Sequence, residues 1–325
     1  MIRILGAGAW GSALAILWAD APDGVELVAR TSGEAEAMRS TRQSRRLPGF
    51  SLPDGVRVAH PGDLAALGQD DLLVVAVPSD AIAATVPGAA AGASTVIVAT
   101  KGLTPAGLRP SEALAAVGIE ARRTLVLSGP NLAREIASGL PAAAVIAGEP
   151  VEAERVQRRL GRPRFRLYRS EDPIGVEVSG ALKNVIAIAV SAVRSLGYGE
   201  NAAAALLSRG VAEMARLAEA CGGRSETASG LAGVGDLVLT SSNTGSRNAR
   251  LGELLAGGAT VAEAVATIGA TVEGIPTAHG ALAVAARLGV ELPITATVVA
   301  ALERGVPIES LAQALLGRAQ AQEFR

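Results

Sequence analysis

The sequence predicts an α/β domain with a doubly wound parallel sheet, followed by a domain built only of helices. In the first half, short and nearly continuous apolar runs alternate with alanine-rich stretches, the pattern of a parallel sheet with crossover helices. A glycine-rich turn directly follows the first apolar run. From Asp172 onward, strand patterns fade and apolar residues recur at helical spacing. We therefore expect one domain at residues 1–171 and a second at 172–325.

The expected strands are apolar runs, because strands of a parallel sheet are buried on both faces. They are Ile2–Leu5, Val25–Ala29, Leu72–Val77, Thr95–Ala99, Thr124–Leu127 and Ala143–Ala147, with Arg164–Tyr168 as a further candidate.

The second domain opens with an expected helix that starts at Pro173 and runs to about Leu196. Asp172 is a good N-cap residue, and proline suits the first helical position. The further expected helices are Ala202–Ala220, Arg247–Ala256, Val261–Ile268, Thr277–Leu288 and Ile308–Leu316.

Composition excludes several classes of function. The chain has 30 basic and 31 acidic residues, a net charge of −1, which does not suit a general polyanion binder. The arginine-rich stretch 155–169 holds only two aromatic residues, so we interpret it as a solvated helix and edge strand and expect no nucleic-acid partner.

The cysteine and histidine content argues against a disulfide or a metal cage. Cys221 is the one cysteine, and the two histidines are His60 and His279. We expect no metal and a reducing, cytoplasmic compartment. The longest uninterrupted apolar stretches, such as Ala13–Ala19, fall short of the roughly 18 residues that a membrane span needs, so we expect none.

Lysine is rare in this chain. Only two of the 30 basic residues, Lys101 and Lys183, are lysine. We expect these two lysines to do what a guanidinium cannot, such as giving up a proton. The alternative is that lysine stands at these two positions by chance.

Gly6, Gly8 and Gly11 form a GxGxxG pattern between the first strand and a helix expected from Ser12. Such glycines allow a tight turn, approach of the backbone to a pyrophosphate, and close helix packing, so we predict a Rossmann-like dinucleotide site rather than a structural turn. Arg30 stands where an acidic residue would hold the ribose of NAD, which makes NADP at least as suitable. Trp10 either covers the cofactor or packs between the domains.

Polar residues follow two further strands at the edge where ligands bind in such sheets. Lys101 comes after the run Thr95–Ala99, and Ser128, Gly129 and Asn131 come after the next strand. The simpler interpretation of the second group is a loop with a helix cap.

The helix from Pro173 carries Gly180, Lys183, Asn184 and Ala187 on one face. Burying a lysine on an apolar helix costs free energy, which favours a functional role for Lys183. Burial would also lower the pKa of its ammonium group toward the range useful for proton transfer. Asp236, after the glycines of a second turn, either orients Lys183 or caps the next helix.

Ser246, Arg247 and Asn248 open another expected helix. A serine cap, free backbone N–H groups, a guanidinium and an amide together suit a phosphate group. Helix capping alone is the alternative.

These motifs together resemble the bacterial-type NAD(P)-dependent glycerol-3-phosphate dehydrogenases over nearly the whole chain. The matching words are GAGAWGSALA from Gly6, RRLPGFSLP from Arg45, KGL from Lys101, SGPNLAREI from Ser128, GALKNVIAIA from Gly180, GLAGVGDLVLT from Gly230, SRN from Ser246 and VEG from Val272.

The resemblance implies roles for particular residues. Lys183 would be the proton donor and acceptor at the C2 oxygen, with Asp236 as its catalytic partner. The implied substrate contacts are Lys101, Gly129, Asn131, Lys183, Asp236, Ser246, Arg247 and Asn248. The implied cofactor contacts are Gly6, Gly8, Ala9, Trp10, Gly11, Arg30, Lys101, Ala133, Arg247 and Glu273. Two residues depart from the family pattern: Ala9 replaces a frequent serine, and Asn131 replaces the usual serine or threonine.

The expected reaction is reduction of dihydroxyacetone phosphate to sn-glycerol 3-phosphate with NADH or NADPH, which supplies the backbone of glycerophospholipids. A β-hydroxyacid dehydrogenase of the same architecture and a non-catalytic NAD(P) sensor are the alternatives. We expect a small molecule as the partner, and a homodimer is the candidate assembly.

Overall fold

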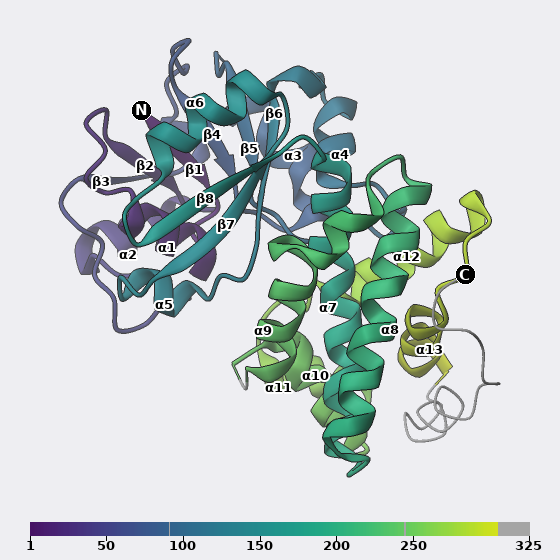
Figure 1. Ribbon diagram of the computed structural model, residues 1–325. Helices are drawn as coiled ribbons and strands as arrows, with labels where there is room; N and C mark the ends of the chain where they lie inside the picture. The colour runs from purple at the N-terminus through teal and green to yellow at the C-terminus, as the bar shows by residue number, and fades with distance from the viewer. Residues whose placement is uncertain (91, 244, 305–325) are drawn as a thin grey trace. The chain divides into compact units, whose positions relative to one another are not determined.

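The computed structural model describes residues 1–90, 92–243 and 245–304. The chain divides into two compact units (Figure 1). The first comprises Met1–Lys101 and Leu108–Glu177, and the second comprises Gly102–Gly107 and the chain from Val178 onward. The expected helix Ile308–Leu316 lies outside the described residues.

The first unit is built on an eight-stranded sheet in the described part of the chain. Its strands are β1 Ile2–Leu5, β2 Val25–Val28, β3 Val56–Ala59, β4 Leu72–Val75, β5 Thr95–Val98, β6 Thr124–Ser128, β7 Ala142–Ala147 and β8 Phe165–Ser170. Their order is β3-β2-β1-β4-β5-β6-β7-β8. This confirms the expected fold class. The expectation of a wholly parallel sheet is wrong at one place, because β7 runs antiparallel to β6.

Helices connect these strands. They are α1 Ala9–Leu17, α2 Ser32–Thr41, α3 Ile82–Ala89, α4 Pro110–Ala116, α5 Ala133–Ala137 and α6 Pro150–Leu160. Helix α1 begins at Ala9 rather than at the expected Ser12, because Gly8 takes the N-cap position. Strand β3 was not expected, since this edge strand alternates and exposes Arg57 instead of forming a continuous apolar run.

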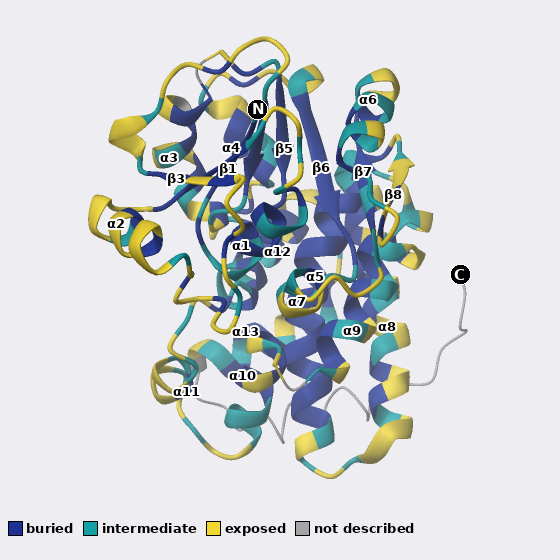
Figure 2. Ribbon diagram, turned by 90° about the vertical axis from the view of Figure 1, so that its left-hand side faces the viewer, coloured by how far each residue is buried: buried dark blue, intermediate teal, exposed yellow. Residues whose placement is uncertain are grey.

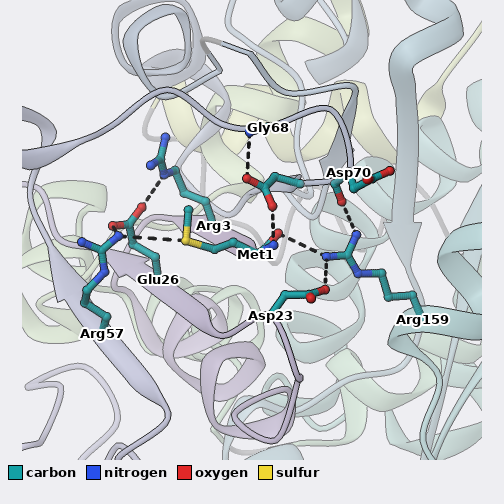
Figure 3. Close-up of polar contacts among 9 residues, drawn as sticks. Met1, Arg3, Asp23, Glu26, Arg57, Gly68, Asp70 and Arg159 are labelled. Carbon is teal, nitrogen blue, oxygen red and sulfur yellow. Dashed lines mark hydrogen bonds and ion pairs between the residues drawn. The ribbon is translucent and has the colours of Figure 1, made fainter.

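Two opposite charges lie inside the sheet of the first unit. Arg3 and Glu26 are register partners on β1 and β2, and neither is exposed. The Arg3 Nε lies 2.5 Å from Glu26 Oε2, and its terminal nitrogens donate to the carbonyls of Ala65 and Ala89. Figure 3 shows Glu26 together with Arg3 and the exposed Arg57, which also pairs with it. Each buried charge is thus matched by an opposite charge or by carbonyl oxygens.

The arginine-rich stretch 155–169 forms most of α6 and of edge strand β8, as interpreted from its sequence. Its side chains form ion pairs within the same unit, such as Arg155 with Glu152 and Arg169 with Glu154. Arg159 binds Asp23 and two backbone carbonyls near the start of the sheet (Figure 3).

The regular secondary structure of the second unit consists of helices in its described residues. Its longer helices are α7 Pro173–Ser195, α8 Gly199–Ala220, α9 Asp236–Ser242, α10 Arg247–Ala256, α11 Val261–Ile268, α12 Gly274–Leu288 and α13 Pro293–Arg304. The first residues of α7 belong to the first unit by the division above. Asp172 caps α7 as expected, because its Oδ1 accepts from Gly175 N at 2.8 Å. Helix α13 was not expected, whereas α9 is the helix, expected without bounds, that follows Asp236.

Helix α7 is almost wholly buried and appears in dark blue in Figure 2. Among the described residues, α7 is the one helix that is long and apolar enough to cross a membrane, with a mean hydropathy of 1.6 over 18 residues. That stretch of 18 residues is completely buried within the protein. Uninterrupted apolar runs had not pointed to it, because Glu177 and Lys183 break the run.

Buried glutamate Glu213 of α8 holds the start of α13. Its carboxylate accepts hydrogen bonds from the backbone N–H groups of Ile294 and Thr295 and from the Thr295 hydroxyl. Burial raises the pKa of Glu213, while these hydrogen bonds act in the opposite direction. A side chain from one helix therefore caps another.

Candidate active site

Glycine is suited to each of three positions in the first turn for a different reason. Gly6 has φ +112°, and a Cβ there would lie 2.6 Å from Ala76 O. A Cβ at Gly11 would lie 1.9 Å from Gly6 O, so this glycine permits the close packing of α1. At Gly8, no atom of the described chain lies within 4 Å of a Cβ. The space beside Gly8, at the N-terminus of α1, is where the fingerprint places a pyrophosphate.

Trp10 and Lys101 lie together in the first unit. The Lys101 Nζ is 6.0 Å from the centroid of the Trp10 ring and donates to Gly129 O at 2.7 Å. Trp10 packs against the core of its own unit, and its buried Nε1 has no hydrogen-bond partner in the described chain. The structure thus brings together three residues that the sequence had placed in different loops.

The turn after β6 carries Gly129 and Asn131. Gly129 has φ +142°, a conformation that favours glycine. The Asn131 Nδ2 donates to Ala143 O at 3.3 Å, whereas its buried Oδ1 has no partner in the described chain. An unused carbonyl oxygen could accept a hydrogen bond from a ligand hydroxyl. Asn131 therefore stays a predicted substrate contact.

Two further predicted cofactor contacts lie in the same unit. Arg30 lies two residues after the end of β2 and is exposed, and its backbone N–H donates to Glu34 Oε2 at 3.1 Å. Ala133 is the first residue of α5 and packs against the core. Position 30 holds a guanidinium and not a carboxylate. The preference for NAD or NADP is therefore expected to depend on Arg30 and the residues around it.

The second unit holds a buried ammonium group. Lys183 of α7 donates from Nζ to Thr240 Oγ1 at 2.7 Å and to Asp236 Oδ1 at 3.1 Å. The Lys183 side chain is 8% exposed and that of Asp236 is 2% exposed. The charged partner and the hydroxyl compensate for the loss of water around the lysine.

Asp236 is the first residue of α9 and follows a π-helical turn, Leu231–Gly235. A Cβ at Gly233 would lie 2.0 Å from Ala228 O, so glycine is needed for this turn to pack. The side chain of Asp236 contacts Lys183 through its Oδ1. Of the two alternatives from the sequence, the structure therefore shows the contact with Lys183.

Thr240 was missed by the sequence interpretation. It lies four residues after Asp236 on the same face of α9, and its Oγ1 is 3.3 Å from Asp236 Oδ1. The i, i+4 spacing of a hydroxyl and a carboxylate in the word GVGDLVLT was the available indication.

The start of α10 contains the predicted phosphate-binding residues. Ser246 caps the helix, since its Oγ accepts from Ala249 N at 3.2 Å, and the hydroxyl hydrogen remains able to donate. Arg247 is exposed, and one arm of its guanidinium donates to Thr271 O at 2.5 Å. A guanidinium fork and a helix N-terminus therefore lie side by side at this place.

Asn248 is buried and makes two contacts. Its Nδ2 donates to Asn184 Oδ1 at 2.9 Å, and its Oδ1 accepts from Gly274 N at 3.0 Å. Asn184 lies beside Lys183 on α7, a position that the sequence had placed on the lysine face without a role. Glu273 precedes Gly274 and takes the N-cap position of α12.

The residues of the first unit fit a bound nicotinamide dinucleotide. The open space at Gly8 suits a pyrophosphate, and the buried Trp10 Nε1–H is a donor for which the described chain offers no acceptor. No group of three or more His, Cys, Asp or Glu residues suited to a metal ion occurs within residues 1–90, 92–243 and 245–304.

Family models match both parts of the chain. The model of the NAD-dependent glycerol-3-phosphate dehydrogenase N-terminus matches residues 1–154, and the model of the C-terminus matches residues 172–313. This chain belongs to the NAD-dependent glycerol-3-phosphate dehydrogenase family. The resemblance inferred from the motifs is thereby confirmed.

Relatives agree with this family assignment. A glycerol-3-phosphate dehydrogenase [NAD(P)+] from Thiobacillus denitrificans is 39% identical over 99% of both chains. Another from Acidovorax ebreus is 45% identical over 93% of both chains. The crystal structure of a glycerol-3-phosphate dehydrogenase from Coxiella burnetii is similar with a TM-score of 0.90, at 35% identity, and covers 98% of both chains.

Proposed function

We propose that this protein reduces dihydroxyacetone phosphate to sn-glycerol 3-phosphate with NADH or NADPH, in a reversible reaction. The observation that carries the proposal is the buried Lys183 ammonium held by Asp236 and Thr240. Lys183 lies in the region that the family model of the C-terminus matches, and it can donate a proton. Close to it, a helix start suited to phosphate can anchor a phosphorylated ketone.

When bound, a reduced nicotinamide would supply the hydride for C2 of the ketone. Gly6, Gly8 and Gly11 with the start of α1 would hold its pyrophosphate, next to Ala9. Trp10, Arg30, Lys101, Ala133, Arg247 and Glu273 are the remaining proposed cofactor contacts.

Lys183 donates a proton from Nζ to the C2 oxygen as the new C–H bond forms, and the C2 carbonyl becomes a secondary alcohol. Asp236 holds the ammonium and stabilises its charge, and Thr240 fixes its direction. In the oxidation of glycerol 3-phosphate, the neutral amine accepts the same proton.

The phosphate is proposed to bind at the start of α10, to Ser246, Arg247 and Asn248, with Lys101, Gly129 and Asn131 as further substrate contacts. Charge-assisted hydrogen bonds from Arg247 and from backbone N–H groups would fix the ketone relative to Lys183. The product, sn-glycerol 3-phosphate, supplies the glycerol backbone of glycerophospholipids.

Parallel assays with NADH and NADPH test this function. Purified protein supplied with dihydroxyacetone phosphate should oxidise at least one of them, and the ratio of the two rates measures the contribution of Arg30. A protein that binds cofactor but turns over only carboxylate substrates would be a β-hydroxyacid dehydrogenase. One that binds cofactor without any turnover would be a sensor.

The cytoplasm as location and a homodimer as assembly belong to the same proposal. A single cysteine, Cys221, suits a reducing compartment. Light scattering of the purified protein at several concentrations would measure the oligomeric state.

A further inference from the structure

Three helices of the second unit meet at one tightly packed junction. Asn184 and Ile188 of α7 contact Asn248 and Gly252 of α10, and Gly274 at the start of α12 packs against the same place. We call these five residues the helix junction. Since 184 and 188, and likewise 248 and 252, are one turn apart, α7 and α10 touch at two successive turns.

Gly252 allows the backbones of α7 and α10 to approach closely. A Cβ at Gly252 would lie 2.2 Å from Ile188 O and 3.1 Å from Ala192 N. Because the obstacle at 2.2 Å is a backbone carbonyl, no side-chain movement relieves the overlap. Alanine at position 252 would therefore push α10 away from α7.

Gly274 is crowded by the ends of side chains. A Cβ there would lie 2.7 Å from Asn248 Oδ1, 2.7 Å from Ile188 Cδ1 and 3.2 Å from Asn184 O. Two of these atoms can move, so alanine at position 274 should disturb the junction less than alanine at position 252. It would nevertheless weaken the hydrogen bond between Gly274 N and Asn248 Oδ1.

The helix junction stands directly beside both ends of the proposed substrate site. Lys183 precedes Asn184 on α7, and Arg247 precedes Asn248 on α10. The proton donor and the phosphate anchor are therefore connected through an amide–amide hydrogen bond of 2.9 Å and a backbone contact one turn away. Such a connection leaves little freedom in the spacing between them.

We propose that the helix junction sets the distance between Lys183 and the phosphate-binding start of α10, and so selects ketone phosphates by length. The preferred substrate has one methylene between the carbonyl carbon and the phosphate ester oxygen. A longer homologue reaches the phosphate anchor with its carbonyl displaced from Lys183. This inference rests on the proposed function and names the residues that decide its substrate length.

The test compares Gly252→Ala and Gly274→Ala with Gly257→Ala as the matched control. Gly257 ends the same helix α10 with φ −78°, and a Cβ there would have its nearest neighbour at 3.5 Å, an ordinary contact. Each variant is assayed with cofactor, using dihydroxyacetone phosphate and its homologue with one additional methylene. Inhibition constants are measured for glycerol 3-phosphate and for inorganic phosphate.

In Gly252→Ala, we expect the preference for dihydroxyacetone phosphate over the homologue to fall at least about fivefold, because a displacement of about 1 Å can cost up to 100-fold in rate. Glycerol 3-phosphate should bind about tenfold more weakly, since it spans both ends of the site. Inorganic phosphate contacts only one end, so its inhibition constant should change less than about twofold. Gly257→Ala should match the wild type.

Gly274→Ala should show a smaller change in the same direction. Adding Ile188→Val removes the Cδ1 atom that crowds position 274 and should restore the preference. This pair carries the test if Gly252→Ala does not fold. Parallel loss of both inhibitors in Gly252→Ala or Gly274→Ala, or unchanged length preference in both, would overturn the proposal. A wild-type protein inactive on dihydroxyacetone phosphate would instead overturn the proposed function.

Discussion

Lys183 and Asp236 form a buried ion pair, with Nζ 3.1 Å from Oδ1. Asp236 is the first residue of α9, while Lys183 lies near the middle of α7. The hydroxyl of Thr240 contacts both partners. An ammonium in this environment has a fixed direction and little contact with water, which is what a positioned proton donor requires.

Replacing Lys183 by arginine should abolish most of the activity. Arginine keeps the positive charge but does not exchange its proton near neutral pH, so we expect kcat to fall by about 10²- to 10⁴-fold. Steady-state rates with dihydroxyacetone phosphate measure the loss, and fluorescence titration of NADPH checks that cofactor binding is retained. Substantial turnover by Lys183→Arg would contradict the proton-transfer role.

Gly8→Ala should weaken cofactor binding without loss of stability. The added methyl enters open space beside the α1 N-terminus, where it competes with the pyrophosphate, and we expect about a tenfold higher Kd for NADPH and NADH. Gly33→Ala is the matched control, because Gly33 also has no neighbour within 4 Å of a Cβ. Equal cofactor affinity in both variants would argue against a pyrophosphate at Gly8.

Glu26→Ala should strongly destabilise the first unit. It leaves Arg3 buried without its carboxylate partner, and breaking such a pair costs about 3–5 kcal/mol. Urea unfolding measures the change. The double variant Arg3→Met, Glu26→Leu should recover most of the stability, since apolar side chains of similar size often replace a buried pair at little cost. If the double variant is no more stable than Glu26→Ala, unpaired charge is not the cause.

Glu213 should make stability fall as the pH rises. Burial raises the pKa of this carboxyl above its ordinary value of 4.5, so between the two values the folded chain holds a proton that the unfolded chain has released. The free energy of unfolding therefore decreases with rising pH through this window. Glu213→Gln removes the titration, so urea unfolding from about pH 5 to pH 8 should show a shallower decrease in the variant. A parallel slope in the two proteins would contradict the assignment to Glu213.

The sequence by itself determined the fold class and the main chemical groups. Nearly continuous apolar runs predicted six of the strands, because burial on both faces disfavours polar residues, and the candidate Arg164–Tyr168 corresponds to β8. It missed β3, an edge strand whose Arg57 is exposed, and the antiparallel direction of β7, which depends on pairing with β6. Local patterns do not encode the direction of a neighbouring strand.

For the site, the scarcity of lysine pointed to Lys101 and Lys183, and the glycine fingerprint pointed to the turn at Gly6–Gly11. Only tertiary structure decided that Asp236 contacts Lys183, and that Thr240 joins them. It also decided that Asn248 bonds to Asn184 across two helices. Residues distant in sequence meet through helix packing, and the close approach at Gly252 that permits it depends on the shapes of both surfaces.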